Sequence, residues 1–147
     1  MLICAFDPGN HTGWVLYNTE TSIPIACGTL LEDDMPMSLD FLFEIYNIDI
    51  VVYETFNLYP ALAKQLSWNS FYPVEVIGQI KLLAQQRRCK SIVGQQPSIK
   101  KFAGQPTIEE IKYLKSLATT EFGGKYTEHT KDAYFHLLYY LRFNKIF

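Results

Sequence analysis

The feature that most limits the possible folds is an acidic residue placed between two strand-like segments near the start of the chain. The apolar run 2–6 ends on Asp7, a turn-forming Pro-Gly-Asn follows, and residues 12–17 again have the composition of a strand. This pattern predicts two strands joined by a turn, with a carboxylate at the rim of a sheet. Such a carboxylate, beside a glycine turn that lets a large ligand approach, suits the binding of a divalent metal against a phosphate.

The composition is that of an ordered globular protein. The chain has 147 residues, of which 48% are hydrophobic and 19% are charged, so we expect a single domain, residues 1–147, with a substantial core. No apolar run approaches the roughly 20 residues that span a bilayer, and no signal peptide is evident. Three widely spaced cysteines, Cys4, Cys27 and Cys89, fit neither a zinc site nor a disulfide framework. We therefore predict reduced thiols, a cytoplasmic location and no membrane association.

Charge is distributed unevenly along the chain. Residues 1–75 carry ten acids and one base, although the net charge of the whole chain is only −2. Residues 76–108 carry six bases and no acid, and the bases are Lys81, Arg87, Arg88, Lys90, Lys100 and Lys101. A basic segment of this kind is typical of a strip that binds a polyanion such as DNA. A solvated helix face is an equally simple explanation of the same charges.

The order of the expected elements predicts an α/β fold. The spacing of apolar and turn residues indicates strands at 2–7, 12–17, 24–30, 49–54 and 91–94, and helices at 38–46, 73–88, 107–119 and 127–143. The first three strands have short connections, so they form an antiparallel meander. In the last helix we expect Tyr134, Phe135, Leu138 and Tyr139 to pack on the sheet. The result is a mixed sheet with helices on its faces.

Four side chains that can bind metal are expected to converge. Asp7 ends the first strand and Glu54 ends the buried strand 49–54, so the two carboxylates share one end of the sheet if those strands are neighbours. His129 and Asp132 are three residues apart, which places them on one face of the last helix. Two divalent ions bridged by one Asp could stabilise both the attacking water and the leaving oxygen of a phosphodiester. Carboxylates without cysteine favour Mg²⁺ or Mn²⁺ over Zn²⁺.

Each of these residues also has an ordinary structural explanation. An Asp before Pro-Gly is a common turn residue, and a Glu at a strand end is often only a solvated terminus. His129 could flank the helix start, and Asp132 would gain from the helix dipole in any protein. Only the joint occurrence of the four residues indicates a metal site.

Five segments resemble the motifs of a known family. AFDPGNHTGW, IVVYETF and HTKDAYFHLLYY resemble the three acidic motifs of the RuvC-type Holliday junction resolvases, which belong to the RNase H-like superfamily. EVIGQIKLLAQ resembles the family's glycine-containing helix, and QQPSIKKFAG resembles its Pro-x-x-x-Lys segment. The motifs occur in the family's order over nearly the whole chain. The compact length and the short stretch after Gly104 look more like the phage-encoded branch than the bacterial one.

The resemblance implies a fold and an active site. The fold would be an RNase H-like mixed sheet, with three antiparallel strands and two parallel ones, flanked by helices. Asp7 would bridge two Mg²⁺ ions, for which Mn²⁺ could substitute, and Glu54 and Asp132 would be the other carboxylate ligands. His129 would bind the second ion or orient the attacking water, and the second role is favoured because Mg²⁺ prefers oxygen ligands.

The resemblance also implies contacts with branched DNA. Lys100 would hold the scissile phosphate region, while Lys101, Arg87 and Arg88 would follow neighbouring phosphates. The bacterial proteins have an aromatic residue three positions beyond the second acid, where this chain has Asn57, so Phe56 or Tyr59 is the candidate for stacking on a base. A homodimer, with exposed apolar residues of helix 73–88 at its interface, would match the two-fold symmetry of a four-way junction.

Three other functions remain open. A related nuclease could cut RNA–DNA hybrids or structured RNA, and flaps or replication forks could be accepted besides four-way junctions. A non-catalytic nucleic-acid-binding module is a second alternative, but a binder gains nothing from concentrating acids beside DNA. The actin-like ATPases share an early Asp and a glycine turn, yet they need a second phosphate loop and a much longer chain.

Overall fold

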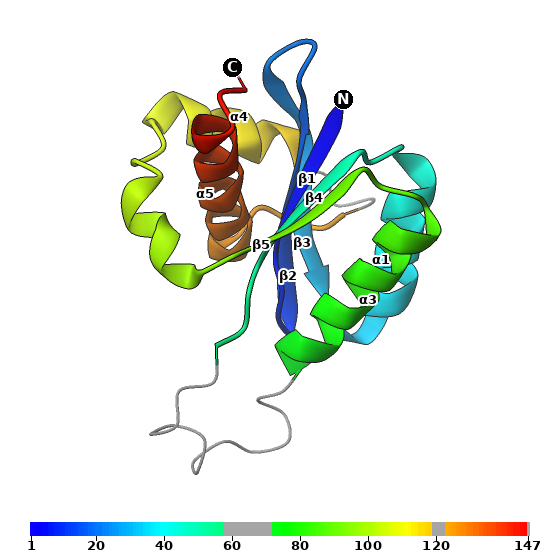
Figure 1. Cartoon of the computed structure of the whole chain (residues 1–147). Helices are drawn as coiled ribbons and strands as arrows, with labels where there is room; N and C mark the ends of the chain where they lie inside the picture. Colours follow the sequence, from blue (N-terminus) through cyan, green and yellow to red (C-terminus); the bar gives the residue numbers. More distant parts are fainter. Residues whose placement is uncertain (58–71, 119–122, 147) are drawn as a thin grey trace.

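The computed structural model describes residues 1–57, 72–118 and 123–146 and consists of a central β-sheet with helices on both faces (Figure 1). The strands are β1 (Leu2–Asp7), β2 (His11–Asn18), β3 (Ile23–Leu31), β4 (Ile50–Glu54) and β5 (Ser91–Gln95). They form one five-stranded sheet in the order β3-β2-β1-β4-β5. β1, β2 and β3 pair antiparallel, whereas β4 and β5 run parallel to β1. This arrangement confirms the predicted mixed sheet.

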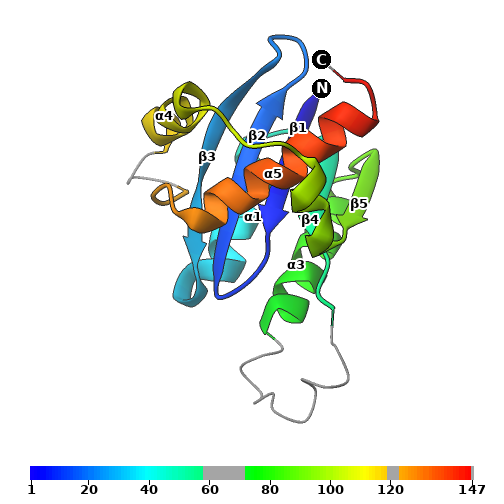
Figure 2. The same ribbon diagram turned by 90° about the vertical axis from the view of Figure 1, so that its left-hand side faces the viewer.

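The helices cover the sheet in two layers. They are α1 (Met35–Ile45), α3 (Tyr72–Gln86), α4 (Ile108–Leu117) and α5 (Glu128–Phe143), with short 3-10 helices η1 (Glu32–Asp34) and η3 (Pro97–Phe102). Figures 1 and 2 show α1 and α3 on one face of the sheet and α4 and α5 on the other, with α5 lying across the strands.

β1 lies at the centre of the sheet and is buried on both sides. Cys4 and Phe6 belong to the cluster with α1 and α3, whereas Ile3 and Ala5 belong to the cluster with α5. Successive side chains of a strand point to opposite faces, so a strand covered on both faces has a continuous apolar run instead of an alternating one. The apolar run before Asp7 is therefore explained by the central position of β1. Asp7 is the last residue of this strand and lies at one end of the sheet.

The structure differs from the sequence predictions in a few places. The apolar face of α5 is centred on Ala133 and Leu137, both fully buried, while Tyr139 is half-buried and stacks on Phe143 instead of packing on the sheet. The expectation for Tyr139 was therefore wrong, because Tyr139 lies on the opposite side of the helix from Leu137 and outside the cluster that packs on the sheet. The 3-10 helix η3 was not anticipated. All three cysteines are free thiols, as predicted. No helix in the described ranges is long and apolar enough to cross a membrane.

Candidate active site

Two carboxylates lie side by side at one end of the sheet. Asp7 is the last residue of β1, and Glu54 is the last residue of β4. The two strands are parallel neighbours, and their last register pair is Phe6 with Tyr53, one residue before each acid. The predicted neighbour relationship of the strands is thus confirmed, and it brings together two acids 47 residues apart in the sequence.

Gly13 on β2 lets the start of α5 approach this edge of the sheet. Gly13 is the antiparallel partner of Asp7. A Cβ atom at Gly13 would lie 1.9 Å from the carbonyl oxygen of His129 and 2.5 Å from the amide nitrogen of Thr130. Only glycine leaves room for the helix backbone at this position, so Gly13 allows the first turn of α5 to sit against the end of β1 (Figure 2).

A group of threonines fixes the first turn of α5 to β3. Thr127 caps the helix, since its hydroxyl accepts a hydrogen bond from the backbone amide of His129. The buried Thr130 hydroxyl donates to the Gly28 carbonyl oxygen at 2.9 Å and lies 3.0 Å from the Thr29 hydroxyl. Buried hydrogen bonds of this kind are costly to lose, so the start of α5 has a defined position and orientation.

The predicted site residues are linked by contacts with Lys100 and His129. The Lys100 ammonium lies 2.9 Å from a Glu54 carboxylate oxygen and 3.3 Å from one of Asp132. The His129 Nδ1 atom lies 3.0 Å from the Asp7 Oδ2 atom. The structure therefore brings Asp7, Glu54, His129 and Asp132 to one edge of the sheet, together with Lys100 from η3.

Burial and nearby negative charge together raise the pKa of Asp7. Burial is the main cause, and the neighbouring charges of Glu54 and Asp132 add to it, so the pKa rises from 3.8 to about 6 although the hydrogen bond from His129 opposes the shift. Burial alone would also raise the pKa of Glu54. Hydrogen bonds from His136 and Lys100 outweigh burial there, and the pKa of Glu54 falls below its ordinary value. Asp7 is thus the acid that most lacks a compensating positive charge.

Lys100 stands where these carboxylates attract a cation. Partial burial lowers its pKa, but the contacts with Glu54 and Asp132 outweigh burial and raise the pKa above the ordinary value. Lys100 was predicted to meet DNA phosphate, whereas here its ammonium neutralises two of the acids. The sequence placed Lys100 in the right region but gave no sign of this pairing.

His136 is a member of the site that sequence reasoning missed. It lies on α5 four residues after Asp132 and is completely buried. Its Nε2 atom lies 2.7 Å from Glu54 Oε2, and its Nδ1 atom lies 2.9 Å from Gln95 Oε1 on β5. The available signal was a histidine inside an otherwise apolar run, one helical turn beyond the last acid.

The residues predicted to bind DNA are spread over the molecule. Lys101 is exposed next to Lys100, and Phe56 is half-buried two residues beyond Glu54. Arg87 and Arg88 directly follow α3 and precede β5, and Arg87 pairs with Asp40 of α1 at 3.6 Å. Because β5 runs parallel to β4, its start lies at the opposite end of the sheet from Glu54, so the structure does not bring these arginines to the acids. Tyr59 lies outside the described residues.

The donor set at this edge has the chemistry of a site for a hard divalent cation. Three carboxylates come from β1, β4 and α5, the charges of Glu54 and Asp132 add to the raised pKa of Asp7, and no cysteine takes part. Across the ranges that the structure describes, no three acidic, histidine or cysteine side chains are grouped closely enough to hold a metal ion in their present positions. In these positions Lys100 pairs with Glu54 and Asp132, and His129 contacts Asp7. The residues therefore fit a divalent cation by type and placement, with side-chain rearrangement.

The whole chain resembles solved structures of one kind. Thermus thermophilus RuvC in complex with a Holliday junction substrate superposes with a TM-score of 0.70 at 12% identity, over 99% of this chain and 95% of that one. A second Thermus thermophilus RuvC structure gives a TM-score of 0.66 at 14% identity, over 98% and 97% of the two chains. The yeast mitochondrial Holliday junction resolvase gives 0.57 at 12% identity, over 97% and 80%.

These likenesses define the fold. The chain has the fold of the RuvC-type Holliday junction resolvases, as the sequence motifs predicted. No protein-family model matches the sequence, and no curated protein matches it either.

Proposed function

We propose that this protein is a metal-dependent endonuclease that cuts four-way DNA junctions, with residues 1–147 acting as one nuclease domain. The observation that carries the proposal is the gathering of Asp7, Glu54 and Asp132 at one sheet edge of a RuvC fold, where the Lys100 ammonium joins Glu54 and Asp132 and the charges of both act on Asp7. Acids from three distant segments seldom gather for structural reasons, since each charge makes the others less stable.

Each residue of the site has a specific task in this proposal. Asp7, Glu54 and Asp132 hold the metal ions, two per site, with Mg²⁺ as the expected ion and Mn²⁺ as a substitute. The bound ions would supply an activated water and stabilise the charge that develops on the phosphate. His129, which contacts Asp7, would hold the attacking water or serve as a further ligand. Lys100 would pass from the acids to a DNA phosphate when metal and substrate are both present.

Contacts with DNA are proposed for residues next to the acids. Lys100 and Lys101 lie on η3, and Phe56 follows Glu54 at the end of β4. The two lysines would neutralise phosphates near the cleaved bond, and the Phe56 ring would stack on a base near the crossover. Arg87 and Arg88 would contact only the distal part of a junction arm, because they lie at the other end of the sheet.

An exposed apolar stripe on α3 suggests how two copies could associate. Val74 and Leu82 are 48% and 55% exposed, and Gly78 lies between them at a spacing of four residues, which places all three on one side of the helix. Nothing in the described structure lies within 4 Å of a Cβ atom at Gly78, so packing within the chain does not require this glycine. Glycine in a helix interior costs about 1 kcal/mol relative to alanine. Close approach of a second copy would explain why it is present.

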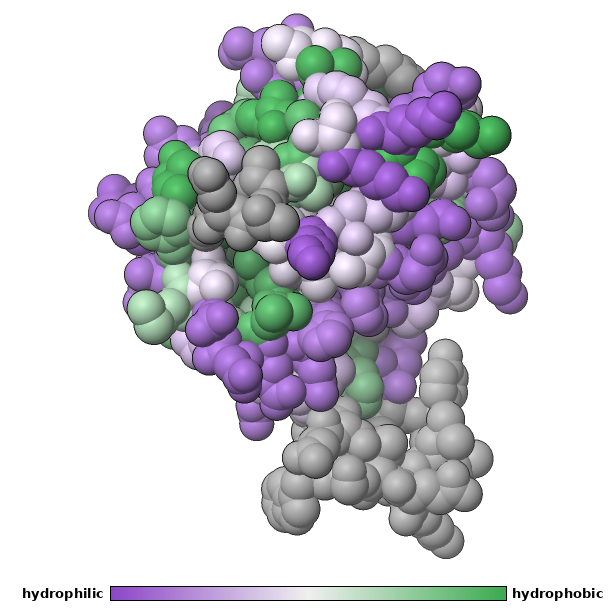
Figure 3. All heavy atoms as spheres, turned by 180° about the vertical axis from the view of Figure 1, so that it is seen from behind, coloured by the Kyte–Doolittle hydropathy of each residue, from purple (hydrophilic) through white to green (hydrophobic). Residues whose placement is uncertain are grey.

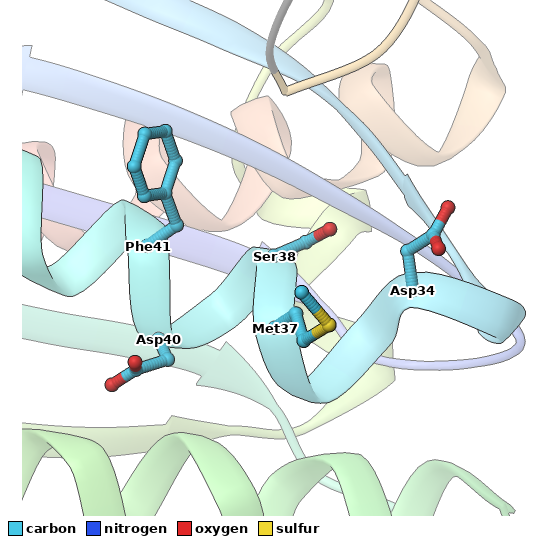
Figure 4. Close-up of a pocket in the computed structure, with 5 residues that line it drawn as sticks. All are labelled: Asp34, Met37, Ser38, Asp40 and Phe41. Atoms are coloured by element: carbon cyan, nitrogen blue, oxygen red, sulfur yellow. The ribbon is translucent and has the colours of Figure 1, made fainter.

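The neighbouring α1 helix extends the apolar surface. Met37 and Ile45 are 79% and 48% exposed, and Figure 3 shows hydrophobic patches on the side of the molecule that carries α1. Met37 and Phe41 line an open pocket on this helix, in which Asp40 points towards α3 (Figure 4). We therefore propose a symmetric homodimer through the α1 and α3 layer, which would leave the acidic edge of each copy free for one strand of the junction.

Cleavage of defined substrates tests the proposed function. A mobile four-way junction, a flap, a plain duplex and an RNA–DNA hybrid of matched sequence are incubated with Mg²⁺ or Mn²⁺, and cuts are mapped on all strands. We expect metal-dependent cuts near the crossover of the four-way junction, and much slower cleavage of the plain duplex. Preferred cleavage of the hybrid would instead indicate an RNA-directed nuclease, and binding without cleavage would indicate a non-catalytic module.

Substitution of an acid provides the matched control. Asp7→Asn removes the charge of the central acid and should abolish most cleavage while leaving junction binding largely intact. Glu20→Gln removes an exposed carboxylate in the turn between β2 and β3, at the other end of the sheet from Asp7, and should cut at the rate of the wild type. Equal rates for both variants and the wild type would contradict the proposed metal site. A phage origin and a cytoplasmic location remain predictions from the sequence.

A further inference from the structure

His136 is a buried polar residue that the proposed chemistry does not itself require. Its side chain is 0% exposed, and it lies in the layer between α5 and the sheet, where its neighbours on the helix are Ala133, Leu137 and Tyr140. A histidine in such surroundings is stable only if its ring nitrogens find partners. Both of them do, and each partner is on a different strand.

The two partners hold the imidazole ring in one orientation. Nε2 lies 2.7 Å from Glu54 Oε2, and it must donate because a carboxylate oxygen only accepts. Nδ1 lies 2.9 Å from the side-chain amide of Gln95, a residue that is itself buried, with an exposed fraction of 7%. Glu54 and Gln95 face each other as a register pair of β4 and β5. The three side chains therefore form a chain of hydrogen bonds that links α5, β4 and β5.

The contact with His136 leaves one oxygen of Glu54 available. Oε2 receives both the His136 N–H at 2.7 Å and the Lys100 ammonium at 2.9 Å. Within the described part of the chain, Oε1 makes no hydrogen bond, and the Glu54 side chain is 18% exposed. Because Oε2 is held from the interior, the carboxylate cannot rotate freely, and Oε1 stays directed away from His136.

We propose that His136 is a positioning residue, which fixes the Glu54 carboxylate so that one of its oxygens is presented to the metal, while Gln95 holds the imidazole from behind. This inference rests on the proposed function, since it names a role at the same site. A residue that fixes a ligand carboxylate removes the entropy that the side chain would lose on binding metal. Its loss is therefore expected to weaken metal affinity more than DNA affinity.

Two amide substitutions separate positioning from simple space-filling. The side-chain nitrogen of His136→Gln can reach the position of Nε2 and donate to Glu54. His136→Asn is one methylene shorter, so its amide reaches only the position of Nδ1, next to Gln95. Both variants are neutral, polar and buried. A merely structural histidine would be replaced about equally well or equally badly by either amide.

The test measures Mn²⁺ binding by calorimetry on the DNA-free protein, with junction affinity and cleavage rate measured beside it. We expect His136→Asn to bind Mn²⁺ about 10–100-fold more weakly and to cut more slowly, with junction affinity within about twofold of the wild type. His136→Gln should recover most of the Mn²⁺ affinity. Circular dichroism and thermal melts establish that both variants are folded. If Asn does not fold, Gln95→Leu, which removes only the rear support of the imidazole, should show a smaller loss of Mn²⁺ affinity.

The possible outcomes separate this inference from the proposed function. Mn²⁺ affinities equal to the wild type in folded His136→Asn, or in Gln95→Leu where Asn does not fold, would overturn the positioning role and leave the nuclease proposal intact. An equal loss of affinity in the Asn and Gln variants would also overturn it. If the wild-type protein binds no Mn²⁺ and the Glu54→Gln substitution has no effect, both the positioning role of His136 and the nuclease proposal are overturned.

Discussion

Asp7 occupies a position that is unfavourable for a negative charge. It lies at the end of β1, where burial, with a smaller contribution from two further carboxylates, raises its pKa to about 6. In the unfolded chain its pKa returns to about 3.8. Between these two pH values the folded state binds more protons than the unfolded state, so stability falls as pH rises through this window. The loss amounts to about 3 kcal/mol once pH exceeds the folded pKa.

This leads to a prediction for Asp7→Asn. In EDTA, the free energy of unfolding of the variant should exceed that of the wild type at pH 7.5 and approach it at pH 4, because asparagine carries no charge at either pH. Saturating Mn²⁺ should reverse the order, since only the wild type gains from metal binding. Urea denaturation at four pH values measures the difference. A variant that is destabilised equally at pH 4 and pH 7.5 would contradict the pKa of Asp7.

Lys100 leads to a second prediction at the residue scale. Its ammonium holds Glu54 and Asp132, so it competes with any other cation for these oxygens. Lys100→Met should therefore bind Mn²⁺ severalfold more tightly than the wild type in the absence of DNA, while it binds the junction more weakly. Lys101→Met is the matched control, because this exposed neighbour is proposed to contact DNA and forms no ion pair with the acids in the described part of the chain. Calorimetry and gel-shift titrations separate the two effects.

At the scale of elements, the site depends on how closely the first turn of α5 approaches β2. Gly13 allows the contact, and Thr127 and Thr130 hold the helix start against β3. The acids lie on β1, β4 and α5. A shift of α5 by a fraction of its diameter would therefore separate Asp132 and His129 from Asp7. Packing of two elements, more than any single hydrogen bond, therefore assembles the site.

Gly13→Ala tests this dependence. The added methyl would meet the His129 carbonyl at 1.9 Å, so the helix must move, and we expect a destabilisation of about 1–3 kcal/mol together with loss of cleavage. Gly78→Ala is the control, because it adds the same methyl in an α-helix where nothing lies within 4 Å. Gly78→Ala should raise the free energy of unfolding of the isolated subunit by about 1 kcal/mol. Equal effects of the two variants on melting would contradict the close approach.

The elements themselves could be predicted from the sequence, but their side-chain partners could not. Periodicity and turn residues located the strands and α-helices of the described residues, because each has a local pattern of apolar residues. The neighbour relationship of β1 and β4 also followed from their continuous apolar runs. The contacts of Lys100 and His136 depend on distances between segments 32–82 residues apart, for which a single sequence has no local signal. The same limit applies to Arg87 and Arg88. Their charge was evident from the sequence, but the sequence did not show at which end of the sheet they lie.

At the scale of the whole molecule, the two faces of the sheet have different roles. The face under α5 builds the acidic edge, whereas the α1 and α3 layer carries exposed apolar side chains. A four-way junction presents two equivalent strands, so a nuclease with one site per chain cuts both at once only as a symmetric pair. The proposed dimer therefore belongs to the function as much as the acids do.

Leu82→Glu tests the dimer. A charge in the middle of the α3 stripe should convert a dimer into a monomer at micromolar concentration, measured by sedimentation, and should replace paired cuts by single nicks. Ile108→Glu is the control, since Ile108 is 71% exposed on α4, at the other face of the sheet. A wild type that sediments as a monomer at all concentrations, with junction bound, would contradict the proposed interface.

α5 follows the five strands of the sheet in the sequence, and this order has a consequence for biosynthesis. A nascent polypeptide that has not yet reached residue 127 possesses Asp7 and Glu54 but lacks Asp132, His136 and the cover for Ile3, Ala5 and Val52. Such an intermediate can neither close its second layer nor bring the third acid to the others. On the proposed function, a newly made molecule therefore cannot cut DNA until α5 has been synthesised and has packed on the sheet.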